Sequence, residues 1–211
     1  MTPETITVLF LALFFLEFAV EFVLNELNIV HTRRGSSADI PAFFDGSMTR
    51  GAYEKSIDYT LARARFNRWT SIYLTLVAFW IIFGGVLPVV DRFAGNLAVY
   101  FPSWARADGI IFCLAVGFIF GAASLPTGIY STFVLEQRFG FNKTTPVVYI
   151  ADRLKGLALG LVIGVPFLFC VLWLMERAGP HWWFWVFLFI VAFQLVMVIV
   201  FPTLIAPLFN K

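Results

Sequence analysis

Five long apolar stretches constrain this chain more than any other feature of its sequence. A helix that crosses a bilayer needs about 20 mostly apolar residues, and stretches of that kind lie at 6–28, 69–90, 110–135, 157–175 and 182–204. They are too long and too continuously apolar for the strands of a membrane barrel. The sequence therefore predicts an all-α, polytopic helical bundle with about five transmembrane helices, in a single membrane domain covering residues 1–211.

The composition agrees with lipid as the surrounding solvent. Apolar residues make up 60% of the chain and charged residues 13%, whereas a soluble domain carries about 25% charged residues. The net charge of +2 is small and no basic patch is interleaved with aromatic residues, so no nucleic-acid partner is indicated. We expect an integral, multi-pass membrane protein of the bacterial inner membrane or endoplasmic reticulum type, with the lipid bilayer as its first partner.

The basic residues predict an orientation. Most of the 15 Lys and Arg residues lie in the segments 31–68 and 136–156, whereas Arg92, Arg106 and Arg177 lie on the other side. Loops rich in Lys and Arg stay in the cytoplasm. We therefore expect 31–68 and 136–156 to be cytoplasmic loops, the N-terminus to lie outside, and the C-terminus to lie in the cytoplasm.

Small residues and prolines mark the third and fourth stretches. Glycines recur at a spacing of four residues, which lets helix backbones approach closely, and we expect them to serve helix packing within the chain, with a dimer interface as the alternative. These glycines are Gly117, Gly121, Gly156, Gly160 and Gly164. Pro126 and Pro166 each remove a helix hydrogen bond and favour a kink.

A polar stripe runs along the first stretch. Its members are Glu17, Glu21, Asn25 and Asn28, which fall within about 80° of one helix face at 100° per residue. A carboxylate in hydrocarbon is costly, so such residues face protein or water. Either the stripe lines a hydrated chamber, or each Glu bonds a neighbouring helix in its protonated form because burial disfavours the charge. Glu26 is expected on the opposite side, near the inner interface.

Two cytoplasmic segments contain further helices. The residues from Tyr53 to Trp69 have a helical apolar face and lead into the second stretch. Gly140 breaks the helix that continues from the third stretch. A new helix begins at "NKTTP", with Thr144 or Thr145 as its N-cap and Pro146 in its first turn.

Four segments carry a resemblance to a known family. They read "YEKSIDYTLARARF", "STFVLEQRFGFNKTT", "ADRLKG" and "IAPLFNK", and they resemble the N-terminal membrane domain of the CAAX prenyl protease 1 family, the type I CAAX proteases. The resemblance implies membrane helices around a water-filled chamber, and membrane-associated or prenylated proteins as substrates. It also implies a downstream metalloprotease domain, in which an H-E-x-x-H helix and a later Glu bind zinc.

The chain departs from this family at the zinc site. Neither His31 nor His181 begins an H-E-x-x-H motif. We therefore assign no catalytic, cofactor-binding or metal-binding residue, and expect zinc and activity only together with the missing downstream part. The natural gene is expected to continue past Lys211 and to encode that part.

Three functions compete at this point. The first is the N-terminal transmembrane domain of a CAAX-type zinc metalloendopeptidase, which forms part of the intramembrane chamber. The second is a stand-alone, non-enzymatic membrane scaffold or a small transporter. The third, a catalyst that uses Glu17 and Glu21 as an acid–base pair, is disfavoured because no nucleophile or metal set accompanies them.

Overall fold

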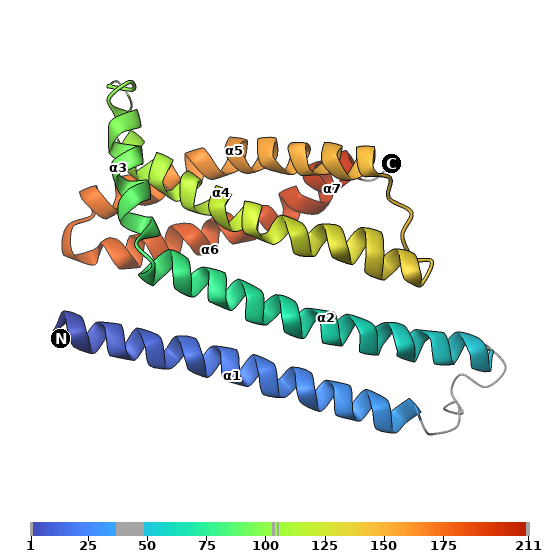
Figure 1. Cartoon of the computed structure of the whole chain (residues 1–211). Helices are drawn as coiled ribbons and strands as arrows, with labels where there is room; N and C mark the ends of the chain where they lie inside the picture. Colours follow the sequence, from blue (N-terminus) through green and yellow to red (C-terminus); the bar gives the residue numbers. More distant parts are fainter. Residues whose placement is uncertain (1, 37–48, 103, 105, 210–211) are drawn as a thin grey trace. The chain divides into compact units, whose positions relative to one another are not determined.

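The structure is a computed structural model that describes residues 2–36, 49–102, 104 and 106–209 (Figure 1). Nearly all of these residues are helical, and no strand occurs within the described ranges. Five helical stretches are long and apolar enough to cross a membrane: Pro3–Arg33, Arg50–Phe83, Ala107–Glu136, Pro146–Arg177 and Gly179–Phe209. The prediction of an all-α, multi-pass membrane protein with five spans is confirmed.

The contacts divide the chain into two compact units. The first comprises Met1–Val86 and Phe120–Lys143, and the second comprises Leu87–Ile119 and Thr144–Lys211. Helix α4 (Ala107–Tyr130) contributes its first half to the second unit and its second half to the first.

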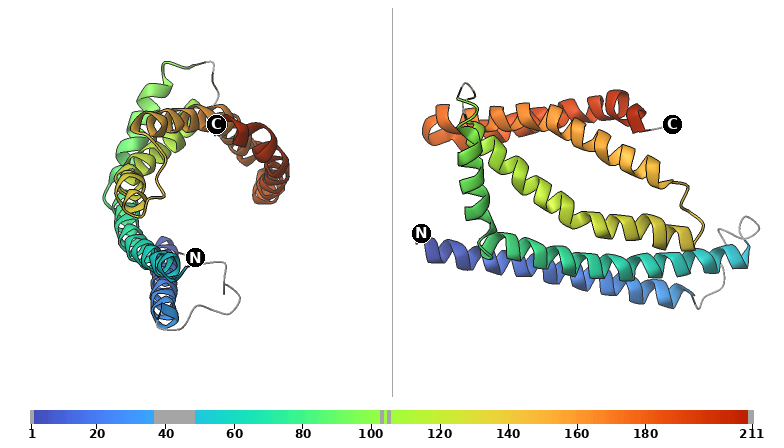
Figure 2. Two further views of the ribbon diagram at one scale, coloured as in Figure 1. Left: turned by 90° about the vertical axis from the view of Figure 1, so that its right-hand side faces the viewer. Right: turned by 45° about the horizontal axis from the view of Figure 1, so that its top comes forward.

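Two long antiparallel helices form the body of the first unit. Helices α1 (Pro3–Ser36) and α2 (Arg50–Phe83) lie side by side in both views of the molecule (Figures 1 and 2). Thr49 caps α2 by accepting a hydrogen bond from the Ala52 N–H at 3.3 Å. Because α2 continues unbroken from this cap into the apolar region, the helix predicted from Tyr53 to Trp69 and the second span are one element.

The second span differs from its predicted range of 69–90 at its end. Helix α2 ends at Phe83, the N–H of Gly84 donates to the Trp80 carbonyl at 2.7 Å, and Gly85 has a φ of +79°. A left-handed residue stops a helix and favours glycine. Residues 86–90 belong instead to α3 (Val86–Ala98), which from Leu87 onward is part of the second unit. Hydropathy alone extended the prediction because those residues are also mostly apolar.

The second half of α4 and the segment after it complete the first unit. Pro126 lies inside α4, which passes into a π-helical segment, η2 (Ser131–Glu136). The Tyr73 hydroxyl donates to the Ala123 carbonyl at 3.0 Å, and the rings of Phe66 and Tyr130 stack with centroids 5.2 Å apart. Helix α2 is therefore held on one side by α1 and on the other by α4 and η2.

The second unit is built around another antiparallel pair, α5 (Pro146–Arg177) and α6 (Trp182–Val200) (Figure 1). A 3₁₀ turn, η3 (Gly179–His181), joins them. The Phe167 ring contacts those of Phe189 and Phe193 with centroids 5.5 and 4.7 Å away. The chain then continues through a π-helical segment, η4 (Phe201–Ile205), into the short helix α7 (Ala206–Phe209).

The residues just before α5 and α4 show how these two helices begin. Thr145 is the N-cap of α5 and accepts from the Val148 N–H at 3.3 Å, with Pro146 in the first turn, as predicted. Arg106, just before α4, has a φ of +69° and its Nη2 lies 2.5 Å from Glu176 Oε2 near the end of α5. Cys113 and Cys170 are free thiols.

Candidate functional site

A groove lined by both polar and apolar residues lies between α1 and α2 in the first unit, with Phe120 of α4 also on its lining. Its larger hollow has a volume of about 500 Å³ and a smaller one, of about 290 Å³, adjoins it. The two hollows share Glu21, Asn67 and Ser71 as lining residues. Since they have these residues in common, we treat them as one feature and call it the α1–α2 groove.

The packing of α1 explains how the predicted stripe reaches this groove. Ile29, only 4% exposed, marks the face of α1 that is buried against α2. At about 100° per residue, Ile29 lies about 120° around the helix from Glu17 and about 40° from Asn25. The stripe therefore flanks the buried face, and its carboxylates reach the edge of the helix pair.

The structure separates the four predicted stripe residues. Glu17 and Glu21 line the larger hollow, and Glu21 and Asn25 line the smaller one. Asn25 Nδ2 also donates to the Ala64 carbonyl of α2 at 3.1 Å. Asn28 is exposed and lines neither hollow. The stripe thus brings three of its members to the groove, while its role as a chamber lining stays a prediction.

Glu26 contacts the same neighbouring helix from the other side of Ile29. Its carboxylate forms an ion pair with Arg68 of α2. Although Glu26 points away from Glu17 as expected, it therefore faces α2, because the contact line between the two helices passes between Asn25 and Glu26.

Sequence reasoning missed the half of the groove that α2 provides. Polar residues recur there at helical spacing, and they are Asn67, Thr70, Ser71 and Thr75. Positions 67, 71 and 75 are four apart, which places them on one helix face. This periodicity is present in "NRWTSIYLT". Uncharged Ser and Thr residues between aromatic residues do not by themselves indicate a polar site, and their role becomes visible only when the opposite helix is known.

The polar groups in the groove are only partly satisfied by one another. The Ser71 hydroxyl donates to Glu21 Oε2 at 3.3 Å. The Thr70 hydroxyl is buried and has no hydrogen-bond partner among the described residues. Buried polar groups without protein partners are commonly satisfied by water. Carboxylate, amide and hydroxyl groups in this arrangement suit water or the backbone of an extended peptide.

The described residues do not offer a metal site. No group of three or more His, Cys, Asp or Glu side chains in that part of the chain is arranged to hold an ion. His31 lies on α1 in the first unit and His181 ends η3 in the second.

The five predicted packing glycines have open surroundings. A Cβ atom added at Gly117, Gly121, Gly156, Gly160 or Gly164 would meet nothing within 4 Å apart from the backbone of its own helix and its chain neighbours. Gly109 is different, since a Cβ there would lie 3.0 Å from Leu172 Cδ1 of α5. The packing role of the five glycines stays a prediction.

The "FGFN" segment forms an aromatic cluster on the first half of α2. The rings of Phe139 and Phe141 contact Tyr59 edge-on, with centroids 5.3 and 4.8 Å away. Gly140 between them has a φ of +76°, and the Lys55 ammonium lies 5.7 Å from the Phe141 ring centroid. The left-handed backbone of Gly140 turns the chain so that the rings of Phe139 and Phe141 both contact the ring of Tyr59.

Comparisons with known proteins connect this architecture with one family. Residues 29–211 match the family described as "CAAX prenyl protease N-terminal, five membrane helices". The chain is 32% identical to a CAAX prenyl protease 1 homologue of Arabidopsis thaliana over 177 residues, which cover 82% of this chain and 41% of the relative. A homologue from Oryza sativa is 31% identical over 191 residues, with 88% and 44% covered.

A solved structure agrees with these matches. The crystal structure of S. mikatae Ste24p superposes with a TM-score of 0.79 at 26% identity, and the match covers 92% of this chain and 46% of the other. The chain thus spans less than half the length of the relatives it matches.

Proposed function

The chain belongs to the CAAX prenyl protease N-terminal family, and we propose that it forms the N-terminal transmembrane part of a CAAX-type zinc metalloendopeptidase. The observation that carries this proposal is the match of residues 29–211 to a family of five membrane helices, together with the five spans of the structure. The relatives carry the name CAAX prenyl protease. The proposed substrates are accordingly prenylated or otherwise membrane-associated proteins.

Within that enzyme, the α1–α2 groove is proposed to form part of the wall of a hydrated intramembrane chamber. Two carboxylates inside a membrane span are costly in contact with lipid, at about 2.5–3.5 kcal/mol for a charged residue at the helix centre on insertion scales. Polar residues of α2 face the same hollow. The matching polarity of both helices supports a role in holding water, or a peptide backbone, at membrane depth.

The chemistry of the reaction is assigned to a metalloprotease part outside residues 1–211. The zinc site and its general base are proposed to lie in that second part, as the resemblance implies. The membrane helices would contribute confinement and orientation of the substrate, which lower the barrier by bringing reacting groups together.

Expression of the longest reading frame that contains residues 1–211 tests the proposed function. Its product is expected to bind zinc and to cleave a prenylated CAAX peptide in a chelator-sensitive manner. A matched preparation of residues 1–211 alone is expected to do neither. Zinc-dependent proteolysis by residues 1–211 alone would contradict the division of labour. A full product without zinc or proteolytic activity would favour a membrane scaffold instead.

A further inference from the structure

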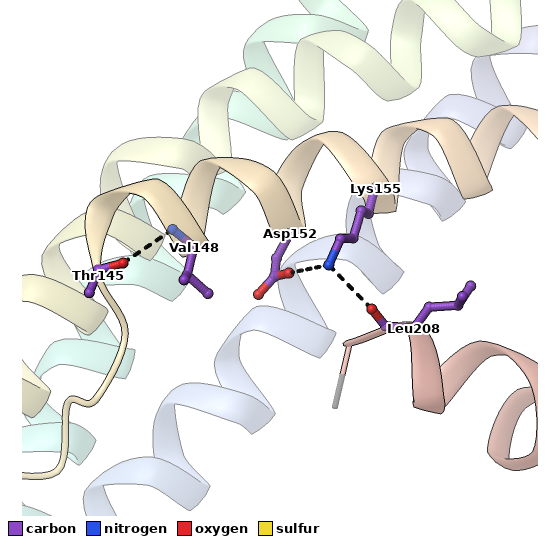
Figure 3. A network of polar contacts seen from close by, with 5 residues as sticks. All are labelled: Thr145, Val148, Asp152, Lys155 and Leu208. Atoms are coloured by element: carbon purple, nitrogen blue, oxygen red, sulfur yellow. Dashed lines mark hydrogen bonds and ion pairs between the residues drawn. The ribbon is translucent and has the colours of Figure 1, made fainter. Parts of the chain in front are cut away.

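Two segments that are far apart in the sequence contact each other in the second unit. "ADRLKG" lies on α5 and "IAPLFNK" contains α7. Figure 3 shows the Lys155 ammonium between the two segments. Its Nζ lies 3.3 Å from Asp152 Oδ1 and 3.3 Å from the Leu208 carbonyl oxygen, and 5.9 Å from the centroid of the Phe209 ring. We call these contacts the Lys155 clamp.

Helix α7 is the last turn of the helical stretch that runs from α6 through η4, and it has four residues. The end of a helix has fewer backbone hydrogen bonds than its interior and opens more easily. The last carbonyls of a helix also lack partners within the helix. A Lys ammonium satisfies one of them and interacts favourably with the negative end of the helix dipole. The donor on Lys155 meets both needs at Leu208.

The other end of the clamp rests on a well-defined helix. Asp152 lies three residues before Lys155 on the same helix and accepts one of its hydrogen bonds, which fixes the direction of the ammonium. Helix α5 itself begins at the Thr145 cap, about two turns before Asp152. On the α7 side, Ile205 is 5% exposed and anchors the chain just before Pro207. The clamp therefore ties α7 to a fixed support.

We propose that Lys155 is a positioning residue that fixes α7, and thereby the orientation of the metalloprotease part that follows the N-terminal region in the relatives. This inference rests on the proposed function, because the Lys155 clamp can orient a metalloprotease part only within an assembled protease. Lys155 touches neither substrate nor zinc in this role. It acts through the backbone of Leu208 and the ring of Phe209.

The geometry of α7 is tested first in residues 1–211 alone. Spin labels are placed on Val162 of α5 and on Leu208, whose side chain points away from Lys155 (Figure 3), after Cys113 and Cys170 are replaced. Lys155→Met, which keeps the aliphatic stem and loses the donors, is expected to broaden the label-to-label distance distribution. Lys143→Met, which removes a charge from an exposed lysine, is the matched control and is expected to change nothing. An unchanged distribution in Lys155→Met would overturn the proposal.

Activity of the assembled protease is tested second. Lys155→Met is expected to lower kcat for a prenylated peptide by about tenfold through misplacement of the reacting groups, with KM unchanged, and Lys155→Arg is expected to restore most of the rate. Asp152→Asn, which preserves the shape of the side chain, should also lower kcat, but by a smaller factor. This variant replaces Lys155→Met in the test if Lys155→Met fails to fold. An unchanged kcat in both variants would overturn the positioning role. An inactive wild-type assembly would instead reject the proposed function and leave the spin-label result intact.

Discussion

Tyr59 is expected to hold the "FGFN" segment on α2. In the structure its ring contacts those of Phe139 and Phe141, and both contacts are edge-on. The turn between the two phenylalanines has backbone hydrogen bonds of its own, from the Phe141 N–H to the Glu136 carbonyl at 2.9 Å and from the Gly140 N–H to the Gln137 carbonyl at 3.0 Å. Replacement of Tyr59 by Leu removes both ring pairs and keeps an apolar side chain.

The size of the effect follows from the two ring pairs. An aromatic pair contributes about 0.5–1.5 kcal/mol beyond its buried area, so two pairs amount to about 1–3 kcal/mol. Phe141 is 52% exposed, which places the expected loss in the lower part of that range, at about 1–2 kcal/mol. A loss of that size raises the population of the locally open segment by about 5- to 30-fold.

Hydrogen exchange of the backbone amides of residues 139–142 measures this opening. Tyr59→Leu is expected to speed their exchange by about 5- to 30-fold, while amides in the middle of α6 keep their rates. Tyr59→Phe is the matched control, since it keeps the ring and loses only the hydroxyl that accepts from Arg63 Nη1 at 2.7 Å. Equal exchange rates in the Leu and Phe variants would refute the ring-pair explanation.

Three further predictions concern other parts of the chain. Gly140→Ala should lower the free energy of unfolding by about 1–2 kcal/mol because of the left-handed φ of Gly140. Gly51→Ala in the first turn of α2 should not lower it, because a Cβ there meets nothing within 4 Å apart from its chain neighbours and the backbone of its own helix. Asn25→Ala should cost about 1 kcal/mol through the lost bond to α2, and Asn28→Ala, the exposed control, less than about 0.5 kcal/mol; equal losses would contradict the assigned contact. Reporter fusions within residues 91–106 and after the C-terminus should report opposite sides of the membrane, and a shared side would reject the predicted orientation.

Features that depend on local chemistry were predictable from the sequence. Span number follows from the length of the apolar stretches, and the start of α5 from Thr145 and Pro146, since a cap and a first-turn proline act on their own helix. The end of α2 was predicted wrongly because the hydropathy averaged over a window stays high across Gly84 and Gly85, whose neighbours are strongly apolar, although the backbone at these glycines stops the helix.

Features that depend on which helices meet were only half predictable. The carboxylates of Glu17 and Glu21 stand out in an apolar stretch, so one side of the groove was evident. The other side, with Ser71 and Thr75, carries no charge and becomes recognisable only when α2 is placed opposite α1. The Lys155 clamp joins residues 53 positions apart, and neither the spacing nor the composition of the two segments indicates that they meet.

Thiol labelling at the α1–α2 groove tests the central claim, that the groove is a hydrated wall inside the membrane, most directly. In a background without Cys113 and Cys170, single cysteines are placed at Glu17, Glu21 and Leu16, and the assembled protein is treated with a water-soluble, membrane-impermeant maleimide. Leu16 is the control, since it is 59% exposed on another face of α1 at the same depth. Labelling at 17 and 21 with none at 16 is the expected result. Labelling of all three positions only by a lipid-soluble reagent would contradict a hydrated groove.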